Sequence, residues 1–150
     1  MKKVLTLCIV HNRHHVLLGM KKRGFGEGKW NGFGGKVNPG ESIEGATRRE
    51  LFEEAGVISN NITKIGTLDF SWQDKPEILE VHIFKTDGFG GEAVESEEMK
   101  PSWFHINDIP YDDMWPDDKF WLPMLIFDQK FKGRFVFDDY NNIVEYQLDS

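Results

Sequence analysis

Residues Gly35 to Val57 read GKVNPGESIEGATRRELFEEAGV, and this stretch decides the fold. Its second half, Ser42 to Ala55, predicts an α-helix. Ser42 is a suitable N-cap, because its hydroxyl can accept a hydrogen bond from a free backbone N–H of the first turn. Gly56 is a natural stop, because glycine adopts the left-handed conformation that ends many helices. The glycine-rich segment 21–40 leads directly into this helix and predicts a loop, or a short strand flanked by loops.

Three glutamates of this helix share one face. At 100° per residue, Glu50, Glu53 and Glu54 fall within an arc of about 100°. They repel one another and lie near the C-terminal end, where the helix dipole disfavours anions. The opposite side is expected to anchor the helix to a core through Leu51, Phe52 and Ala55.

This carboxylate cluster has two interpretations. A solvated acidic face is the ordinary one for three glutamates on a helix. Of the two neighbouring bases, however, only Arg49 points toward the cluster, and a glycine-rich loop precedes the helix. A hard cation would compensate the remaining charge, since Mg²⁺ takes carboxylate oxygens and leaves open positions for water and substrate phosphates.

The rest of the chain reads mainly as strands. Two hairpins and a final strand pair are indicated by apolar alternation around polar turns. A second helix is expected where proline occupies the first position and acids follow it, although Pro123 is expected to kink it or to mark a later start. The expected strands are residues 4–10, 16–20, 62–72, 78–86, 103–106, 131–137 and 143–148; residues 87–96 are expected to form a loop, and residues 116–129 the second helix. This order predicts an α/β (α+β) fold with a mixed β-sheet sandwiched between helices, in one domain covering residues 1–150.

Composition limits the class of function. The chain has 150 residues and a formal net charge of −7, which argues against binding to a nucleic-acid backbone but not against a nucleotide whose phosphates a divalent metal neutralises. The single cysteine, Cys8, allows no intrachain disulfide and favours a reducing compartment. No apolar run reaches the length of a membrane span. We expect a cytoplasmic monomer, with a mitochondrial or nuclear pool left open.

The pattern Gly-x5-Glu-x7-Arg-Glu-Leu-x-Glu-Glu-x-Gly-Val in residues 35–57 matches every fixed position of the Nudix box. On these residues the chain resembles the Nudix hydrolases, which hydrolyse a nucleoside diphosphate linked to another moiety. The resemblance implies a Nudix fold in which the box forms a loop–helix–loop. It also implies Mg²⁺ as cofactor, with Mn²⁺ as a substitute.

The resemblance assigns roles position by position. Glu50, Glu53 and Glu54 match the carboxylates of the metal site, and Arg49 matches the base that orients them. Glu41 matches a residue that supports the loop–helix junction. The carbonyl of Gly34 and the carboxylate of Glu98 match further metal ligands, although an acidic loop around Glu98 is in itself more often simply solvated.

Beyond the box, the chain resembles the MutT-like members of the family that hydrolyse oxidised purine nucleoside triphosphates such as 8-oxo-dGTP and 2-hydroxy-dATP. The matching segments are LLGMKKRGFG at 17–26, KWNGFGGKV at 29–37, EEMKPSWF at 97–104 and MWPDD at 114–118. The purine pocket implied by this likeness is lined by Asn31, Trp115, Asp117, Asp118, Phe25, Phe70 and Leu79. Lys21 and Lys36 are candidate contacts to the triphosphate.

Two of these pocket residues carry a hypothesis about substrate range. If Asp117 and Asp118 are buried side by side, desolvation and mutual repulsion favour one shared proton. A carboxyl group that can donate or accept a hydrogen bond would tolerate both oxidised guanine and oxidised adenine. The alternative interpretation is a helix N-terminal signal, with Pro116 at the first position and acids facing the dipole.

The resemblance implies cleavage between the α- and β-phosphates to give a nucleoside monophosphate and pyrophosphate, with water attacking the β-phosphorus. Glu50, Glu54 and Glu98 stay open as the proton acceptor, because metal ligands and bases are both carboxylates here. The nearest alternatives are Nudix hydrolases of methylated dGTP, ADP-ribose or dinucleotide polyphosphates. A binding module without catalysis and an acidic scaffold are less compatible with an intact box. The partner expected in every enzymatic case is a small nucleotide, not a nucleic-acid polymer or a membrane.

Overall fold

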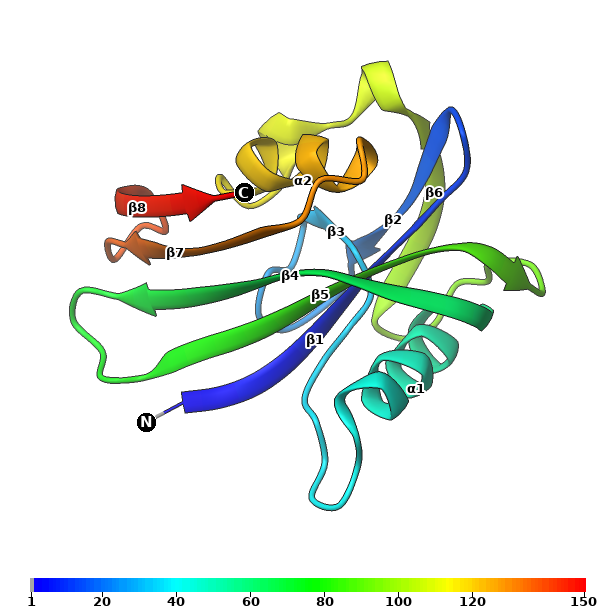
Figure 1. Ribbon diagram of the computed structural model, residues 1–150, viewed down its shortest axis with the longest axis horizontal. Coiled ribbons are helices and arrows are strands. Elements are labelled where there is room, and N and C mark those ends of the chain that lie inside the picture. The colour runs from blue at the N-terminus through cyan, green and yellow to red at the C-terminus, as the bar shows by residue number, and fades with distance from the viewer. Residues whose placement is uncertain (1) are drawn as a thin grey trace.

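The computed structural model describes residues 2–150, which form one mixed sheet with two α-helices (Figure 1). The strands are β1 (Lys2–His11), β2 (His15–Lys21), β3 (Trp30–Asn31), β4 (Ile58–Trp72), β5 (Ile78–Gly90), β6 (Met99–His105), β7 (Phe131–Phe137) and β8 (Ile143–Asp149). The helices are α1 (Ile43–Ala55) and α2 (Asp118–Ile126), and two short 3₁₀ turns, Ile106–Asp108 and Tyr111–Asp113, precede α2.

The sheet runs in the order β3-β2-β1-β5-β4-β7-β8, and β6 pairs with β2 along its whole length. Two pairings are parallel, β1 with β5 and β4 with β7, and the remaining ones are antiparallel. The sheet is therefore mixed, as the strand and helix order predicted.

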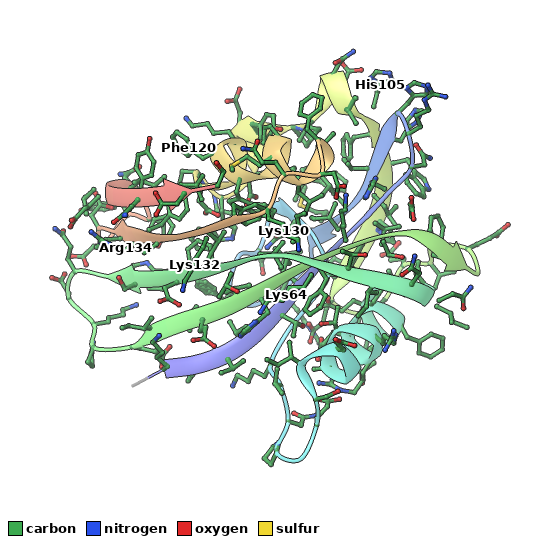
Figure 2. All side chains as sticks on the ribbon, in the orientation of Figure 1. Lys64, His105, Phe120, Lys130, Lys132 and Arg134 are labelled. Atoms are coloured by element: carbon green, nitrogen blue, oxygen red, sulfur yellow. The ribbon has the colours of Figure 1, made fainter. Side chains whose placement is uncertain are left out.

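The two helices cover opposite faces of this sheet (Figure 1). Alternate residues of β1 enter different cores, because successive side chains of a strand point to opposite faces. Cys8 packs in the cluster that contains Leu51 of α1, whereas its neighbour Ile9 packs in the cluster that contains Trp121 of α2. Side chains fill the space between the sheet and each helix (Figure 2). None of the helices in residues 2–150 is long and apolar enough to cross a membrane.

The boundaries of several elements differ from those expected. Strand β5 continues to Gly90, so the first residues of the expected loop 87–96 are strand. Strand β4 starts at Ile58, earlier than the expected residue 62, and pairs with this extension of β5 across three register shifts. Strand β6 starts at Met99 because β2 pairs with it from His15 to Lys21. Both extensions depend on a pairing partner that is distant in the sequence.

The second helix starts at Asp118, two residues later than expected, and continues through Pro123 to Ile126. Only one turn precedes Pro123, so its missing N–H leaves few helical hydrogen bonds unmade. The expected anchoring of α1 was wrong for one residue, because Phe52 is 56% exposed whereas Leu51 and Ala55 are buried. The buried face of α1 includes Ala46 and Thr47 together with Leu51 and Ala55, and Phe52 lies outside this face.

Candidate active site

The loop before α1 passes so close to β1 at Gly34, and to the Glu50 side chain at Gly35, that a Cβ at either position would collide with other atoms. A Cβ on Gly34 would lie 1.8 Å from the carbonyl oxygen of Thr6, and a Cβ on Gly35 would lie 2.7 Å from the carboxyl carbon of Glu50. The amide of Thr6 donates to the carbonyl of Gly35 at 2.9 Å. The loop is thereby held between the sheet and the helix, with its backbone against the glutamates.

Helix α1 has the ends that its sequence predicted. The hydroxyl of Ser42 accepts a hydrogen bond from the amide of Gly45, and Gly56 has φ = 70° at the C-terminus. The amide of Gly56 donates to the carbonyl of Phe52. These ends set where the last turn, and therefore the glutamate face, lies relative to the loop.

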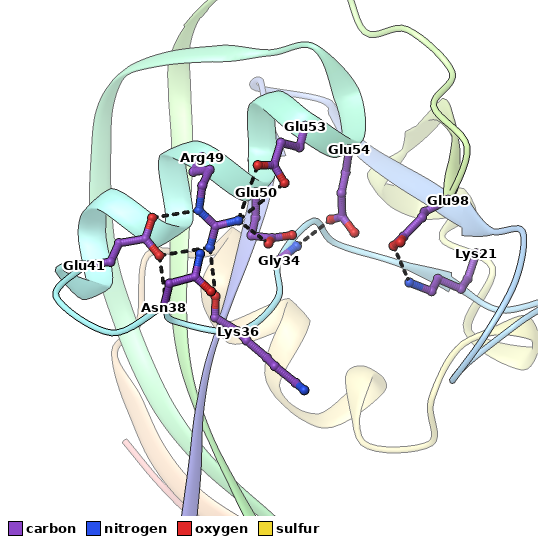
Figure 3. A network of polar contacts seen from close by, with 10 residues as sticks. All are labelled: Lys21, Gly34, Lys36, Asn38, Glu41, Arg49, Glu50, Glu53, Glu54 and Glu98. Carbon is purple, nitrogen blue, oxygen red and sulfur yellow. Dashed lines mark hydrogen bonds and ion pairs between the residues drawn. The ribbon is translucent and has the colours of Figure 1, made fainter.

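Arg49 ties the loop to the helix through a network of charged contacts (Figure 3). Its guanidinium donates to both carboxylate oxygens of Glu41, from Nε at 2.7 Å and from Nη2 at 2.9 Å. Nη1 donates to Glu50 at 2.6 Å and lies 3.4 Å from Glu53. Nη2 also donates to the carbonyl of Lys36 at 2.9 Å. The structure thus places Glu41 and Arg49 at the loop–helix junction.

Glu54 has a different environment from the other helix glutamates. It is only 7% exposed, and its Oε1 accepts a hydrogen bond of 2.8 Å from the amide of Gly34. Burial raises the pKa of Glu54 to about 8, against the lowering effect of the Gly34 amide. Burial also raises the pKa of Glu50, and Arg49 opposes this shift. The protein therefore holds carboxylates where an anion is unfavourable unless a cation is near.

The glutamates line a cavity of about 760 Å³, called here the carboxylate cavity. Its walls are Lys21, Arg23, Gly34, Gly35, Lys36, Asn38, Glu50, Glu53, Glu54, Ser96, Glu97 and Glu98. Glu98 comes from the segment before β6 and bonds the Lys21 ammonium at 3.1 Å (Figure 3). The metal-ligand candidates Gly34, Glu50, Glu53, Glu54 and Glu98 are all on its walls.

This donor set fits a hard divalent cation, because it consists of carboxylate and carbonyl oxygens that partly lack compensating charge. Within residues 2–150, no three His, Cys, Asp or Glu side chains already converge at metal-ligand spacing. Each carboxylate has a partner in the chain instead: Arg49 for Glu50 and Glu53, the Gly34 amide for Glu54, and Lys21 for Glu98. A bound cation would compete with these partners for the carboxylate oxygens.

A second cavity of about 780 Å³, called here the aromatic pocket, adjoins the first. All nine residues that sequence analysis expected to contact substrate line it, namely Lys21, Phe25, Asn31, Lys36, Phe70, Leu79, Trp115, Asp117 and Asp118. They come from the glycine-rich loop, from four strands (β2, β3, β4 and β5), and from the start of α2 with the residues just before it. Five residues line both cavities and form the seam between them: Lys21, Gly34, Gly35, Lys36 and Glu54.

Asp117 and Asp118 are buried side by side, as the shared-proton hypothesis required. Asp117 accepts a hydrogen bond of 2.7 Å from the indole Nε1 of Trp121, so its carboxylate does not cap α2. Asp118 is 2% exposed, and its Oδ2 has no hydrogen-bond partner among the described residues. Burial raises the pKa of both carboxyls, and the adjacent Asp117 raises that of Asp118 further, well above its usual range. Burial and mutual repulsion therefore favour one proton shared within this pair.

Sequence reasoning missed part of the aromatic wall. Phe25 stacks on Trp115 with ring centroids 5.0 Å apart, and Trp72 and Phe137 complete the wall. Trp72 lies two residues after Phe70 on the same strand, and this period-2 spacing was the signal that could have identified it. Phe137 had no such signal, because β7 reaches the pocket only through its parallel pairing with β4.

Comparison with known proteins gives a consistent result. The NUDIX domain model matches residues 1–125. An oxidized purine nucleoside triphosphate hydrolase of Danio rerio is 51% identical over 98% of this chain and 94% of its own length. The protein of the same name in Mus musculus is 49% identical over 97% of this chain and 94% of its own length. The crystal structure of a MutT protein from Bacillus halodurans superposes with a TM-score of 0.89 at 28% identity, covering 98% of this chain and 97% of that one.

Proposed function

Since the chain belongs to the Nudix family, we propose that it hydrolyses oxidised purine nucleoside triphosphates to the monophosphate and pyrophosphate. The observation that carries this proposal is the seam between the two cavities. A base held in the aromatic pocket has its phosphates directed past Lys21 and Lys36 toward the glutamates of α1. Removal of such nucleotides would keep them from mutagenic incorporation into DNA.

Recognition of the base would use the buried end of the aromatic pocket. Trp115 offers an indole face for stacking, worth about 1–3 kcal/mol for one base. With one proton shared by Asp117 and Asp118, one carboxyl can donate to a purine edge while the other accepts from it, and the Asn31 amide can do both. Phe25, Phe70 and Leu79 would form the apolar walls that exclude water from these polar contacts.

Nudix hydrolases generally use a divalent metal such as Mg²⁺. Gly34 through its carbonyl, together with Glu50, Glu53, Glu54 and Glu98, would hold it here. When bound, such an ion neutralises phosphate charge, lowers the pKa of a coordinated water and stabilises the leaving pyrophosphate.

The chain's own residues prepare the site in three ways. Arg49 orients Glu50 and Glu53 from the side away from the cavity. The Gly34 amide directs one oxygen of Glu54 toward the loop. Lys21 and Lys36 supply positive charge where the triphosphate enters, and Glu50, Glu54 or Glu98 would accept the proton of the attacking water.

Other parts of the proposal concern the chain as a whole. Strands β7 and β8 lie beyond the match to the family model but join the same sheet, which supports one functional domain over residues 1–150. A monomer in the cytoplasm remains our prediction, with a mitochondrial or nuclear pool left open.

The proposal is tested by pyrophosphate release from a panel of normal, oxidised and methylated dNTPs, each with Mg²⁺ and with EDTA. We expect 8-oxo-dGTP and 2-hydroxy-dATP to have the highest kcat/KM, and EDTA to abolish turnover. Preferred hydrolysis of a methylated dNTP would reject the substrate class while leaving the Nudix chemistry in place. Release of AMP from ADP-ribose or from a dinucleotide polyphosphate, measured in a parallel assay at a higher kcat/KM, would do the same.

A further inference from the structure

Two polar groups buried in the sheet have no hydrogen-bond partner and take no part in the chemistry described above. Thr6 on β1 is 3% exposed, and its hydroxyl Oγ1 bonds to none of the described residues. His82 on β5 is 8% exposed, and its ring atom Nδ1 likewise has no partner among the described residues. Buried polar atoms nearly always have a partner in the protein or in an ordered water molecule, so both atoms require an explanation.

The two side chains occupy neighbouring positions on the same face of the sheet. Strands β1 and β5 are parallel, and Thr6 is the register partner of His82. Alternate side chains of a strand share a face, so Thr6 shares a face with Cys8, and His82 shares one with Phe84. Cys8 and Phe84 both pack in the cluster on the α1 side. Thr6 and His82 therefore lie side by side under α1.

The hydrogen-bonding capacities of the two atoms are complementary. Nε2 of His82 lies 2.9 Å from a carboxylate oxygen of Glu80, and this hydrogen bond lowers the pKa of Glu80. An ionised carboxylate can only accept, so Nε2 carries the proton, and Nδ1 of the neutral ring is then an acceptor. The Thr6 hydroxyl has a proton to donate. A donor without an acceptor thus lies beside an acceptor without a donor.

Thr6 is also the residue of β1 that contacts both glycines of the loop before α1. Its amide donates to the carbonyl of Gly35 at 2.9 Å, and its own carbonyl oxygen leaves no space for a Cβ on Gly34. The Gly34 amide in turn donates to Glu54 at 2.8 Å. A restraint on Thr6 is therefore passed through backbone contacts to the loop that carries a proposed metal ligand.

We propose that the Thr6 hydroxyl donates to Nδ1 of His82, directly or through one ordered water molecule, and that His82 is thereby a positioning residue for the Gly34–Gly35 loop. The path runs from Glu80 through His82 and Thr6 to the loop. His82 lines neither cavity, so it acts on the metal site only through Thr6. This role rests on the proposed function, because it assumes that the loop holds the metal ion.

The test follows amide hydrogen exchange of the full chain without nucleotide or metal. The amide of Thr6 reports on its bond to Gly35, and the amide of Cys8, which donates to the carbonyl of Phe33 at 2.7 Å, reports on a neighbouring bond between the same two segments. Thr6→Val keeps the branched shape without the hydroxyl, and His82→Phe keeps a ring without Nδ1. Each should lower exchange protection at residue 6 by about 5–10-fold, as for one buried hydrogen bond, and at Cys8 by less than about twofold.

Two further substitutions separate the two nitrogens of His82. His82→Asn places an acceptor oxygen near the position of Nδ1, so protection at Thr6 should stay within about twofold of the wild type. His82→Gln reaches only the position of Nε2, keeps a donor for Glu80 and should behave like His82→Phe. Thr67→Val is the matched control, because Thr67 is the register partner of His82 in β4 and lines neither cavity.

The consequence for the metal site is measured by turnover of 8-oxo-dGTP. His82→Phe should raise the Mg²⁺ concentration that gives half the maximal rate by about 5–10-fold, since the loop would be held less firmly. At saturating Mg²⁺, both kcat and KM for the nucleotide should stay within about twofold of the wild type. A general loss of folding would not separate these quantities.

Equal loss of protection at Thr6 and Cys8 would overturn the inference, because it would mean that the substitutions only weaken the sheet. A Thr67→Val effect as large as that of Thr6→Val, or His82→Asn behaving like His82→Phe, would overturn it as well. Failure of the wild-type chain to hydrolyse any oxidised purine triphosphate would instead reject the proposed function, and the exchange rates would still decide the hydrogen bond. Melting temperatures identify any variant that fails to fold, and the Thr6 and His82 substitutions test the bond independently.

Discussion

The carboxylate cavity and the aromatic pocket share a seam but are assembled in opposite ways. The carboxylate cavity takes most of its charged side chains from α1 and the loop before it, and Glu98 comes from the segment before β6. The second collects residues from the glycine-rich loop, β4, β5, α2 and the β7–β8 turn. The first is consequently a property of local sequence, and the second exists only after the sheet has formed.

The two cavities also solve the problem of buried carboxylates differently. Glu50 forms an ion pair with Arg49, and Glu54 accepts a hydrogen bond from the Gly34 amide. Both carboxylates would be stabilised further by a bound cation. Within residues 2–150, no basic side chain forms a hydrogen bond with Asp117 or Asp118, and burial raises the pKa of both carboxyls so that they favour a shared proton. We infer that Glu50 and Glu54 are arranged to bind a metal ion, and that Asp117 and Asp118 are arranged to form hydrogen bonds with a neutral ligand.

The largest expected effect comes from removing a carboxylate that lines the carboxylate cavity. Glu54→Gln should lower kcat by about 10²–10³-fold, the usual cost of removing one preorganised charged group from an active site. KM and the melting temperature should change little, because the amide can occupy the same buried position. Pyrophosphate release at saturating Mg²⁺ measures the effect. Glu44→Gln is the matched control on the exposed face of α1, and near-normal turnover of the Glu54 variant would exclude it from catalysis.

The next largest effect is expected from substituting one carboxyl of the buried Asp117–Asp118 pair in the aromatic pocket. Asp118→Asn preserves a donor in place of the protonated carboxyl but cannot switch to an acceptor. We expect kcat/KM to fall by about 10–100-fold for one of 8-oxo-dGTP and 2-hydroxy-dATP and far less for the other, as for a buried polar group left without a partner. Affinities for both nucleotides across pH are the measurement, with Asp113→Asn as the exposed control. Unchanged affinity and pH response for both would contradict the shared-proton hypothesis.

A smaller effect concerns stability and pH in the absence of metal. The pKa of Glu54 is about 8 in the folded chain and about 4.5 when exposed, so the folded state binds more protons between these values. Stability must then decrease as pH rises from about 5 to 8, by at most about 1.4 kcal/mol per pH unit from this group. Urea unfolding of the wild type and of Glu54→Gln across that range should show a shallower slope for the variant. Identical slopes of the free energy of unfolding against pH would mean that Glu54 ionises normally. Mg²⁺ should offset the decrease in stability of the wild type at the higher pH, because it would bind the folded state.

The smallest effect uses two adjacent lysines. Lys22 pairs with Glu95 on the surface and lines neither cavity, so Lys22→Ala should change the free energy of unfolding by less than about 1 kcal/mol and leave KM unchanged. Lys21 lines both cavities, and Lys21→Ala should raise KM for 8-oxo-dGTP about tenfold by removing a phosphate contact. Equal effects of the two substitutions would remove the distinction between the seam and its surroundings.

Much of the architecture follows from local signals. The start and end of α1 were predictable from Ser42 and Gly56, because capping depends on residues adjacent in the chain. The hairpin of β1 and β2 and the pair of β7 and β8 were predictable for the same reason. The early start of β6 and the extension of β5 were not, since strand ends are set by partners elsewhere in the sheet.

The candidate site divides along the same line. By itself the sequence determined the glutamate face of α1, because a helix repeats every 3.6 residues whatever it packs against. A resemblance to relatives was needed to link Asn31 with Asp117, since no local rule connects residues so far apart. Three features became visible only in the folded chain: Oδ2 of Asp118 is buried with no hydrogen-bond partner among the described residues, Phe52 is exposed, and Asn141 accepts a hydrogen bond from Trp72. Burial and long-range contact are properties of the packed chain, and they set both the raised pKa values of Asp117 and Asp118 and the shape of the aromatic wall.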